Sequence, residues 1–159
     1  ERPEWHLIGP LQSNKTRLAA THFDWVHSVD RERLATRLAE QRPPELPPLQ
    51  VCIQVNIDGG GNKSGVPPAQ ALDLARAVAV LPRLVLRGLM TIPEPTDDRV
   101  RQHAVHHDAR QLFERLRDQL GPAAARFDTL SMGMSADLEA AIACGSTMVR
   151  VGTAIFGVR

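Results

Sequence analysis

The hydrophobic residues of this 159-residue chain fall into short apolar runs that alternate with longer segments of helical periodicity. Residues 49–57, LQVCIQVNI, form a nearly continuous apolar run rich in β-branched residues, which is typical of a strand covered on both faces. Gly9 and Pro10 stop an earlier run in the way that turn residues end a strand. Strands are therefore expected at residues 5–9, 23–29, 49–57, 84–92, 128–132 and 148–151.

The segments between these strands carry apolar residues at helical spacing, such as Leu34, Ala35 and Leu38. The Pro-rich residues 42–48 cannot be helical, and Gly121 followed by proline marks the end of a long helix. Strict alternation of strand and helix predicts a parallel sheet with right-handed crossovers. Helices are expected at residues 11–22, after Asp30, and at 67–81, 97–120 and 136–144.

Two architectures fit this alternation. A doubly wound sheet would ordinarily carry a Gly-rich phosphate motif near its first strand, but the first turn reads Gly9-Pro10-Leu11. A β/α barrel instead has its phosphate sites in the loops after strands 7 and 8. If the last two strands here are those two, the chain lacks about the first two βα units, and its length fits such a barrel.

Composition and charge narrow the function classes. The 19 basic residues are interleaved with 18 acidic ones and leave a net charge of +1, which gives nucleic-acid binding little support. No apolar run is long enough for a membrane helix, and the first residues do not resemble a signal peptide, so we expect a cytoplasmic protein with no membrane partner. Cys52 and Cys144 lack metal-site spacing and are expected to be buried free thiols.

Residues 130–157 hold two successive βα junctions with small and hydroxyl residues at the strand ends. Such junctions suit a phosphate because free backbone N–H groups and the positive end of a helix dipole meet there. Ser135 is also an expected N-cap of the helix that follows, so the simpler alternative is that Ser135 only caps and Gly152 only turns. The candidate phosphate ligands are Ser131, Ser135, Gly152 and Thr153, with Met134 in the same turn.

Two further groups of polar residues have competing interpretations. Arg150 lies in the apolar run MVRVG, so its side chain is expected to point inward, where a carboxylate such as Glu139 could pair with it. His103, His106 and His107 lie in the expected long helix, and the first and last of them have the spacing of a zinc pair. No third ligand except Asp108 accompanies them, and their neighbours indicate a solvated helix face. His6 and Gly9 end the first strand and could line the ligand site, although we expect His6 to be a buried, hydrogen-bonded histidine. No metal site is predicted.

Four motifs carry a specific resemblance. WHLIGPLQSNKTR at 5–17, NKSG at 62–65, RGLMTIPEP at 87–95 and the segment 130–157 occur in this order. Together they resemble the YggS/PROSC-type pyridoxal 5′-phosphate (PLP) homeostasis proteins. The resemblance implies a (β/α)8 TIM barrel of the alanine racemase N-terminal type, lacking about its first two βα units, with residues 1–159 as a single partial domain. It also implies PLP as cofactor, bound at the mouth of the barrel.

The resemblance assigns six residues to the cofactor: Ser131, Met134, Ser135, Arg150, Gly152 and Thr153. Arg150 would face the pyridine nitrogen, and because arginine does not give up its proton, the ring would stay unprotonated and withdraw electrons weakly. This suits a PLP carrier or regulator, or a racemase, better than a transaminase. The implied partners are PLP and PLP-dependent apo-enzymes, and a monomer is expected.

The chain departs from the family pattern in one respect. The segments like AVSKTKP and GENYVQE, the first of which carries the Schiff-base lysine of such proteins, are not in this sequence, so that lysine is expected upstream of Glu1. Lys15 and Lys63 are expected to face solvent or a surface anion, and no catalytic residue is assigned.

Two other functions stay open beside PLP homeostasis. A racemase-like PLP enzyme would need a tyrosine or cysteine acid, and this chain contains no tyrosine. A barrel fragment that binds nothing tightly is the other alternative, because an arc of strands leaves two sheet edges unpaired.

Overall fold

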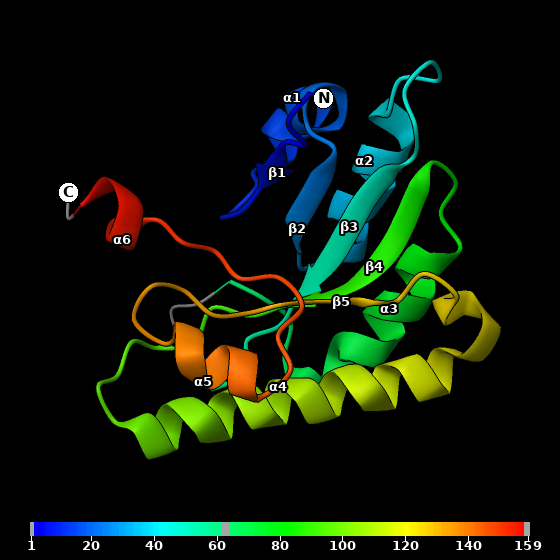
Figure 1. Ribbon diagram of the computed structural model, residues 1–159. Coiled ribbons are helices and arrows are strands. Elements are labelled where there is room, and N and C mark those ends of the chain that lie inside the picture. The colour runs from blue at the N-terminus through cyan, green and yellow to red at the C-terminus, as the bar shows by residue number, and fades with distance from the viewer. Residues whose placement is uncertain (1, 62–63, 158–159) are drawn as a thin grey trace.

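The computed structural model describes residues 2–61 and 64–157. Its strands form one parallel sheet in the order of the sequence, and the sheet curls so that its last strand is turned steeply against its second (Figure 1). The strands are β1 (His6–Leu7), β2 (Trp25–Val29), β3 (Leu49–Gln54), β4 (Leu84–Met90) and β5 (Thr129–Ser131).

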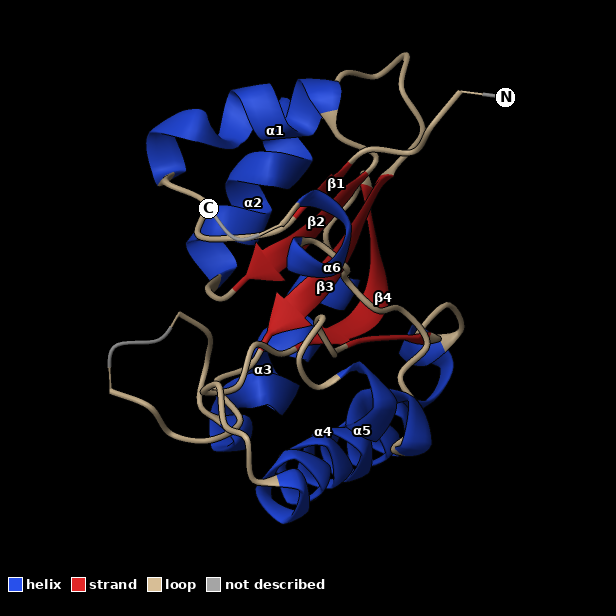
Figure 2. Cartoon of the chain, turned by 60° about the vertical axis from the view of Figure 1, so that its left-hand side comes forward, coloured by secondary structure: helices blue, strands red, loops and turns tan. Residues whose placement is uncertain are grey.

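Helices cover the convex face of the sheet, and each packs against the next along the chain from α1 to α4. A short helix, α5, lies on α4, whereas the last helix, α6, lies apart on the concave side (Figure 1 and Figure 2). The helices are α1 (Thr16–His22), α2 (Glu32–Gln41), α3 (Ala71–Ala79), α4 (Arg99–Leu120), α5 (Leu138–Ala143) and α6 (Thr153–Phe156), with 3-10 turns at Ser13–Lys15, Pro68–Gln70 and Gly121–Ala124.

The main core lies between the sheet and these helices. In β3, Val51 and Ile53 are fully buried in this core, whereas Cys52 between them belongs to a smaller apolar cluster with Trp25 and Met90. Because successive side chains of a strand point to opposite faces, the smaller cluster lies on the concave face. The concave face is therefore partly apolar, and the polar residues among these strands form the site described below.

The longest helix ends where the sequence predicts and begins two residues later, at Arg99. The Asp98 carboxylate accepts hydrogen bonds from the N–H groups of Val100 and Arg101, at 2.9 and 3.2 Å, and so caps α4. At the other end Gly121 takes a φ of +54°, a conformation that glycine adopts without strain. Within the described part of the chain, none of the helices has both the length and the apolar character that a membrane crossing needs.

The prediction of a sixth strand, at residues 148–151, is wrong. In the described residues 148–151 only Met148 pairs with the sheet, through a single parallel bridge to Ser131. Pairing goes no further because β5 is three residues long and Gly133, just beyond it, turns the chain with a φ of +95°. The prediction of alternating parallel strands is confirmed for the other five.

Candidate functional site

Three cavities open beside the segments that the sequence singled out, and Arg150 lines two of them. The first of these two has a volume of about 360 Å³ and lies between the loop after β4, the N-terminal half of α4 and the turn after β5. Four of the predicted cofactor residues line it: Met134, Ser135, Arg150 and Thr153. The second, of about 530 Å³, is lined by His6, Ile8, Met134 and residues 148–152, and so includes Gly152. Arg150 and Met134 are common to both cavities.

Arg150 points inward, as its place in the apolar run predicts. One guanidinium nitrogen donates to the Ser131 hydroxyl oxygen at 2.8 Å, and another donates to the carbonyl oxygen of Thr91 at 2.8 Å. Both acceptors are uncharged, and among the described residues no carboxylate is ion-paired with Arg150. Burial lowers the pKa of Arg150, and the more distant charge of Asp137 partly opposes that effect.

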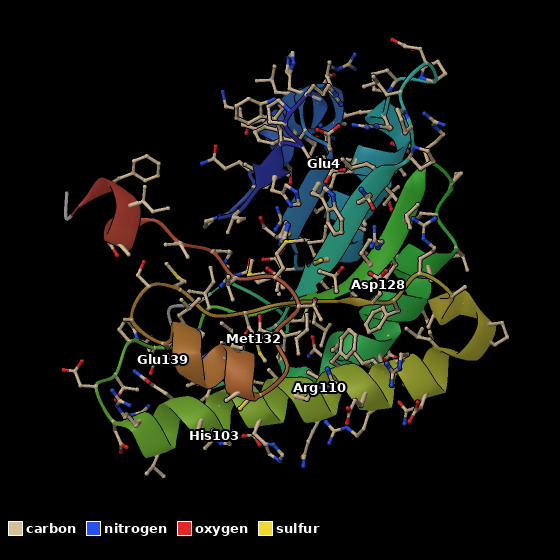
Figure 3. All side chains as sticks on the ribbon, viewed as in Figure 1. Glu4, His103, Arg110, Asp128, Met132 and Glu139 are labelled. Carbon is tan, nitrogen blue, oxygen red and sulfur yellow. The ribbon has the colours of Figure 1, made fainter. Side chains whose placement is uncertain are left out.

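Glu139, the alternative partner of Arg150, faces elsewhere. It lies on α5, above the N-terminal part of α4 (Figure 3), and its carboxylate is 3.9 Å from the guanidinium of Arg99. Both side chains of this pair are largely exposed, so their contact contributes little to stability. The arginine in the wall of the cavities therefore keeps a charge that no described carboxylate neutralises directly.

Ser131 is fully buried at the end of β5 and lines neither cavity. Its hydroxyl lies between Arg150, at 2.8 Å, and the Nδ1 atom of His27, at 3.0 Å. In this structure Ser131 contacts Arg150 and His27, and its assignment as a direct cofactor ligand stays a prediction.

His27 and His6 extend this polar contact across the concave face. His27 Nε2 lies 2.9 Å from His6 Nδ1, and the His6 ring stacks on Trp25 with 5.0 Å between ring centroids. Burial, followed by the neighbouring His6 and Arg150, lowers the pKa of His27 to about 4. His27 is therefore neutral at pH 7. Sequence patterns did not point to His27 because it lies 104 residues from Ser131.

The turn after β5 is held by Asp137. One carboxylate oxygen accepts the Met134 N–H at 2.7 Å, and the other lies 2.9 Å from Nε2 of His106 on α4. His106 is fully buried, which corrects the expectation that the α4 histidines share a solvated face. Its spacing from Ala109 and Phe113, both buried on α4, is the signal that could have revealed this.

Ser135 does not cap the following helix, contrary to expectation. The helix α5 begins at Leu138, after Asp137, and the Ser135 hydroxyl oxygen instead accepts the N–H of Ala154 at 3.3 Å. This hydrogen bond joins the turn after β5 to the first turn of α6. It brings two of the predicted phosphate ligands, Ser135 and Thr153, to one cavity wall.

Gly152 precedes α6 and is exposed. A Cβ atom added there would meet no atom within 4 Å, and its φ of −122° is one that other residues adopt. Thr153 follows as an exposed residue at the start of α6. The backbone here is therefore open to a ligand, and glycine is not required for the fold at this position.

The remaining candidates lie away from the two cavities that Arg150 lines. His103 and His107 are exposed, with ring centroids 6.5 Å apart, and the described residues hold no cluster of three potential metal ligands. Lys15 is exposed at the end of a 3-10 turn, while Lys63 falls outside the described residues. Cys52 and Cys144 are buried free thiols, as predicted.

Comparison with known proteins identifies the family of this chain. The sequence model of the alanine racemase N-terminal domain matches residues 2–159. The chain is 59% identical over 156 residues to the pyridoxal phosphate homeostasis proteins of Vibrio cholerae and Escherichia coli K12, which covers 98% of this chain. It spans 64% and 65% of those two proteins, less than two thirds of their length.

Solved structures agree with this match. PipY of Synechococcus elongatus PCC7942, in a structure with PLP bound, has a TM-score of 0.87 and 39% identity, covering 97% of this chain and 70% of PipY. An alanine racemase of Clostridium difficile 630 has a TM-score of 0.74 at 17% identity, covering 100% of this chain and 41% of the racemase, and shares the fold. The chain therefore belongs to the alanine racemase N-terminal domain family, alongside the pyridoxal phosphate homeostasis proteins, as its motifs predicted.

Proposed function

We propose that this chain binds PLP and acts in PLP homeostasis or carriage rather than in turnover. The observation that carries the proposal is Arg150, a half-buried arginine whose two hydrogen-bond acceptors are uncharged and which is not ion-paired with any described carboxylate. A partly desolvated charge of this kind favours a ligand that brings an acceptor or a negative charge. PLP has both, as a ring nitrogen and a phosphate.

The surroundings of Arg150 support the fit. Both cavities fall in the volume range of small-molecule sites, on the order of 300 to 1,000 Å³. We assign the phosphate to the backbone and hydroxyl groups of Ser135, Gly152 and Thr153, where the chain is open. Met134 contributes apolar contact between them, and Arg150 holds the pyridine nitrogen. When bound, the cofactor supplies an electron-withdrawing ring, and an arginine at that nitrogen leaves the ring unprotonated.

The same proposal includes the architecture. The curled parallel sheet is an arc of a (β/α)8 barrel lacking about two βα units, and residues 1–159 act as one PLP-binding domain. The unbroken strand order, the curl and the structural match to an alanine racemase support this. Delivery of PLP to apo-enzymes, a monomeric state and a cytoplasmic location stay predictions.

A racemase-like enzyme is the second candidate, favoured only by the shared fold. Turnover would require a proton-donating group opposite the ring, and the sequence offers no tyrosine for it.

Titration of the purified chain with PLP, followed by absorbance, tests the proposal. Borohydride treatment and mass spectrometry then identify any lysine that has reacted. We expect saturable binding without covalent attachment at Lys15 or Lys63. Absence of saturable binding contradicts the proposed function, and a stoichiometric adduct at either lysine contradicts the assignment of the covalent lysine elsewhere.

A further inference from the structure

Four polar side chains form a continuous line on the concave face of the sheet. They come from separate parts of the chain: His6 from β1, His27 from β2, Ser131 from β5 and Arg150 from the segment after α5. The successive distances are 2.9 Å between the two imidazoles, 3.0 Å from His27 to the Ser131 hydroxyl, and 2.8 Å from that hydroxyl to the guanidinium. Each distance is that of a hydrogen bond.

The direction of these bonds follows from Arg150. A guanidinium carries only donors, so the Ser131 oxygen must accept from it. The Ser131 hydroxyl hydrogen then needs an acceptor of its own. Within the described part of the chain, Nδ1 of His27 is the one such atom at hydrogen-bonding distance. Ser131 therefore donates to His27.

The same reasoning passes along the line to His6. With its Nδ1 accepting, a neutral His27 carries its hydrogen on Nε2 and donates it to Nδ1 of His6. His6 then carries its own hydrogen on Nε2. The reverse direction would put two donors on Ser131 and leave its hydroxyl hydrogen without a partner where no solvent reaches, which costs free energy.

Two further observations fit this direction. Burial first, and the neighbouring His6 and Arg150 next, hold the pKa of His27 near 4, which keeps one ring nitrogen free to accept. The His6 ring is stacked on Trp25, with 14° between the planes, and Trp25 in turn lies under the guanidinium of Arg87 at 4.6 Å. Stacking of this kind restricts rotation of the His6 ring.

We propose that Ser131 and His27 are positioning residues, which hold Arg150 in one orientation through a one-way chain of hydrogen bonds and leave His6 with its hydrogen on Nε2. The role of this chain at the cofactor site rests on the proposed function, because Arg150 is the residue assigned to the pyridine nitrogen. His6 lines the second cavity together with Arg150. This chain of hydrogen bonds therefore fixes two donors on the cavity wall, the Nε2–H of His6 and the guanidinium of Arg150.

Nitrogen-15 NMR of the histidine side chains tests this chain of hydrogen bonds without any cofactor. In the ligand-free protein at pH 7 we expect His27 and His6 each to be neutral, with the hydrogen on Nε2 and a bare Nδ1. Observation of either ring as the Nδ1–H tautomer, or as an imidazolium, overturns the proposal. This measurement requires no variant, so it does not depend on whether a mutant folds.

A pair of matched variants tests the link to Arg150. Ser131→Ala removes the central hydroxyl, whereas Ser28→Ala removes another buried hydroxyl, from β2, that has no hydrogen-bond partner in the described part of the chain. We expect Ser131→Ala to shift the nitrogen signals of His27 and Arg150 and to raise the dissociation constant for PLP roughly tenfold, as loss of one charge-assisted hydrogen bond predicts. Ser28→Ala should leave these nitrogen signals in place and keep the dissociation constant for PLP within about twofold of the wild-type value. Equal responses of the two variants contradict the positioning role.

The two proposals fail separately. Wild-type protein that shows the expected tautomers and takes up no PLP supports the hydrogen-bonded chain and contradicts only the proposed function. If the protein binds PLP but its histidines have the opposite tautomers, only the proposed chain of hydrogen bonds is contradicted.

Discussion

The guanidinium of Arg150 lies 2.8 Å from the hydroxyl oxygen of Ser131, at the end of the last strand. The backbone reinforces this relationship, since the Arg150 N–H donates to the carbonyl of Gly133 at 3.0 Å. The segment after α5 is thus attached to the sheet by a side chain and a backbone contact, although it adds only a bridge to the sheet. Four consequences for stability and reactivity follow from the surroundings of this contact.

The first concerns pH. The pKa of His27 is about 4 in the folded chain and about 6.5 in an unfolded one, so between these values the unfolded state binds a proton that the folded state does not. The free energy of unfolding should therefore fall as pH decreases from 6.5 to 4, by about 3 kcal/mol from this group.

Denaturant unfolding at several pH values checks this. His27→Gln should be less stable at pH 7 but should lose about 3 kcal/mol less than wild type on going to pH 4. His22→Gln, at an exposed position at the end of α1, is the control and should keep the wild-type slope. Parallel pH profiles for wild type and His27→Gln would show that His27 does not have the lowered pKa.

Asp137 should be a stability residue as well as part of the cavity wall. Asp137→Ala removes the acceptor of the Met134 N–H and leaves the buried ring of His106 without its partner. We expect the free energy of unfolding to fall by about 2–3 kcal/mol. Urea denaturation of Asp137→Ala beside Asp108→Ala, an exposed change on α4, measures the difference. Similar losses in both variants would refute the anchoring role.

Alanine substitutions at two glycines of the site should have unequal effects on stability. A Cβ at Gly133 would lie 2.4 Å from the Ala141 Cβ at a φ of +95°, so Gly133→Ala should destabilise the fold by roughly 2–4 kcal/mol. Gly152→Ala meets no atom within 4 Å and should change stability by less than about 0.5 kcal/mol. If the phosphate contacts this backbone, Gly152→Ala should nevertheless weaken PLP binding about tenfold. Unchanged PLP affinity in Gly152→Ala would show that the phosphate does not contact this position.

The two thiols should be unreactive in the folded protein. Burial raises the pKa of Cys52 to about 12 and also raises that of Cys144, so little reactive thiolate forms at pH 8. A colour-forming disulfide reagent should modify both thiols quickly only in denaturant. In the folded chain Cys52, which is fully buried, should react more slowly than Cys144. Rapid modification of Cys52 under native conditions would contradict its place in the concave cluster.

Local patterns in the sequence predicted most of the elements. The apolar run at 84–92 became β4 (Leu84–Met90), and the helix expected at 97–120 became α4 with its cap at Asp98. These features depend on neighbours within a few residues, such as β-branched runs, caps and terminal glycines, so they can be read along the chain.

Features that depend on distant partners could not be read in this way. A strand was expected at 148–151, but its extent is limited by β5, whose short length and following turn are properties of another segment. Ser135 has the residue type of an N-cap, yet its hydroxyl is bonded to Ala154, which only the folded chain brings near. The contact of His27 with Ser131 spans 104 residues and arises from the curl of the sheet.

We infer that Arg150 forms part of a PLP site, and the dissociation constant for PLP is the quantity that depends on this contact. Wild type, Arg150→Gln and Arg76→Gln, the last an exposed change on α3, should be compared by equilibrium titration at pH 7 after unfolding curves have shown that each is folded. We predict that Arg150→Gln weakens PLP binding by roughly tenfold or more and that Arg76→Gln stays within about twofold of wild type. Equal affinities for all three proteins, or no saturable binding by wild type, would show that Arg150 does not bind PLP.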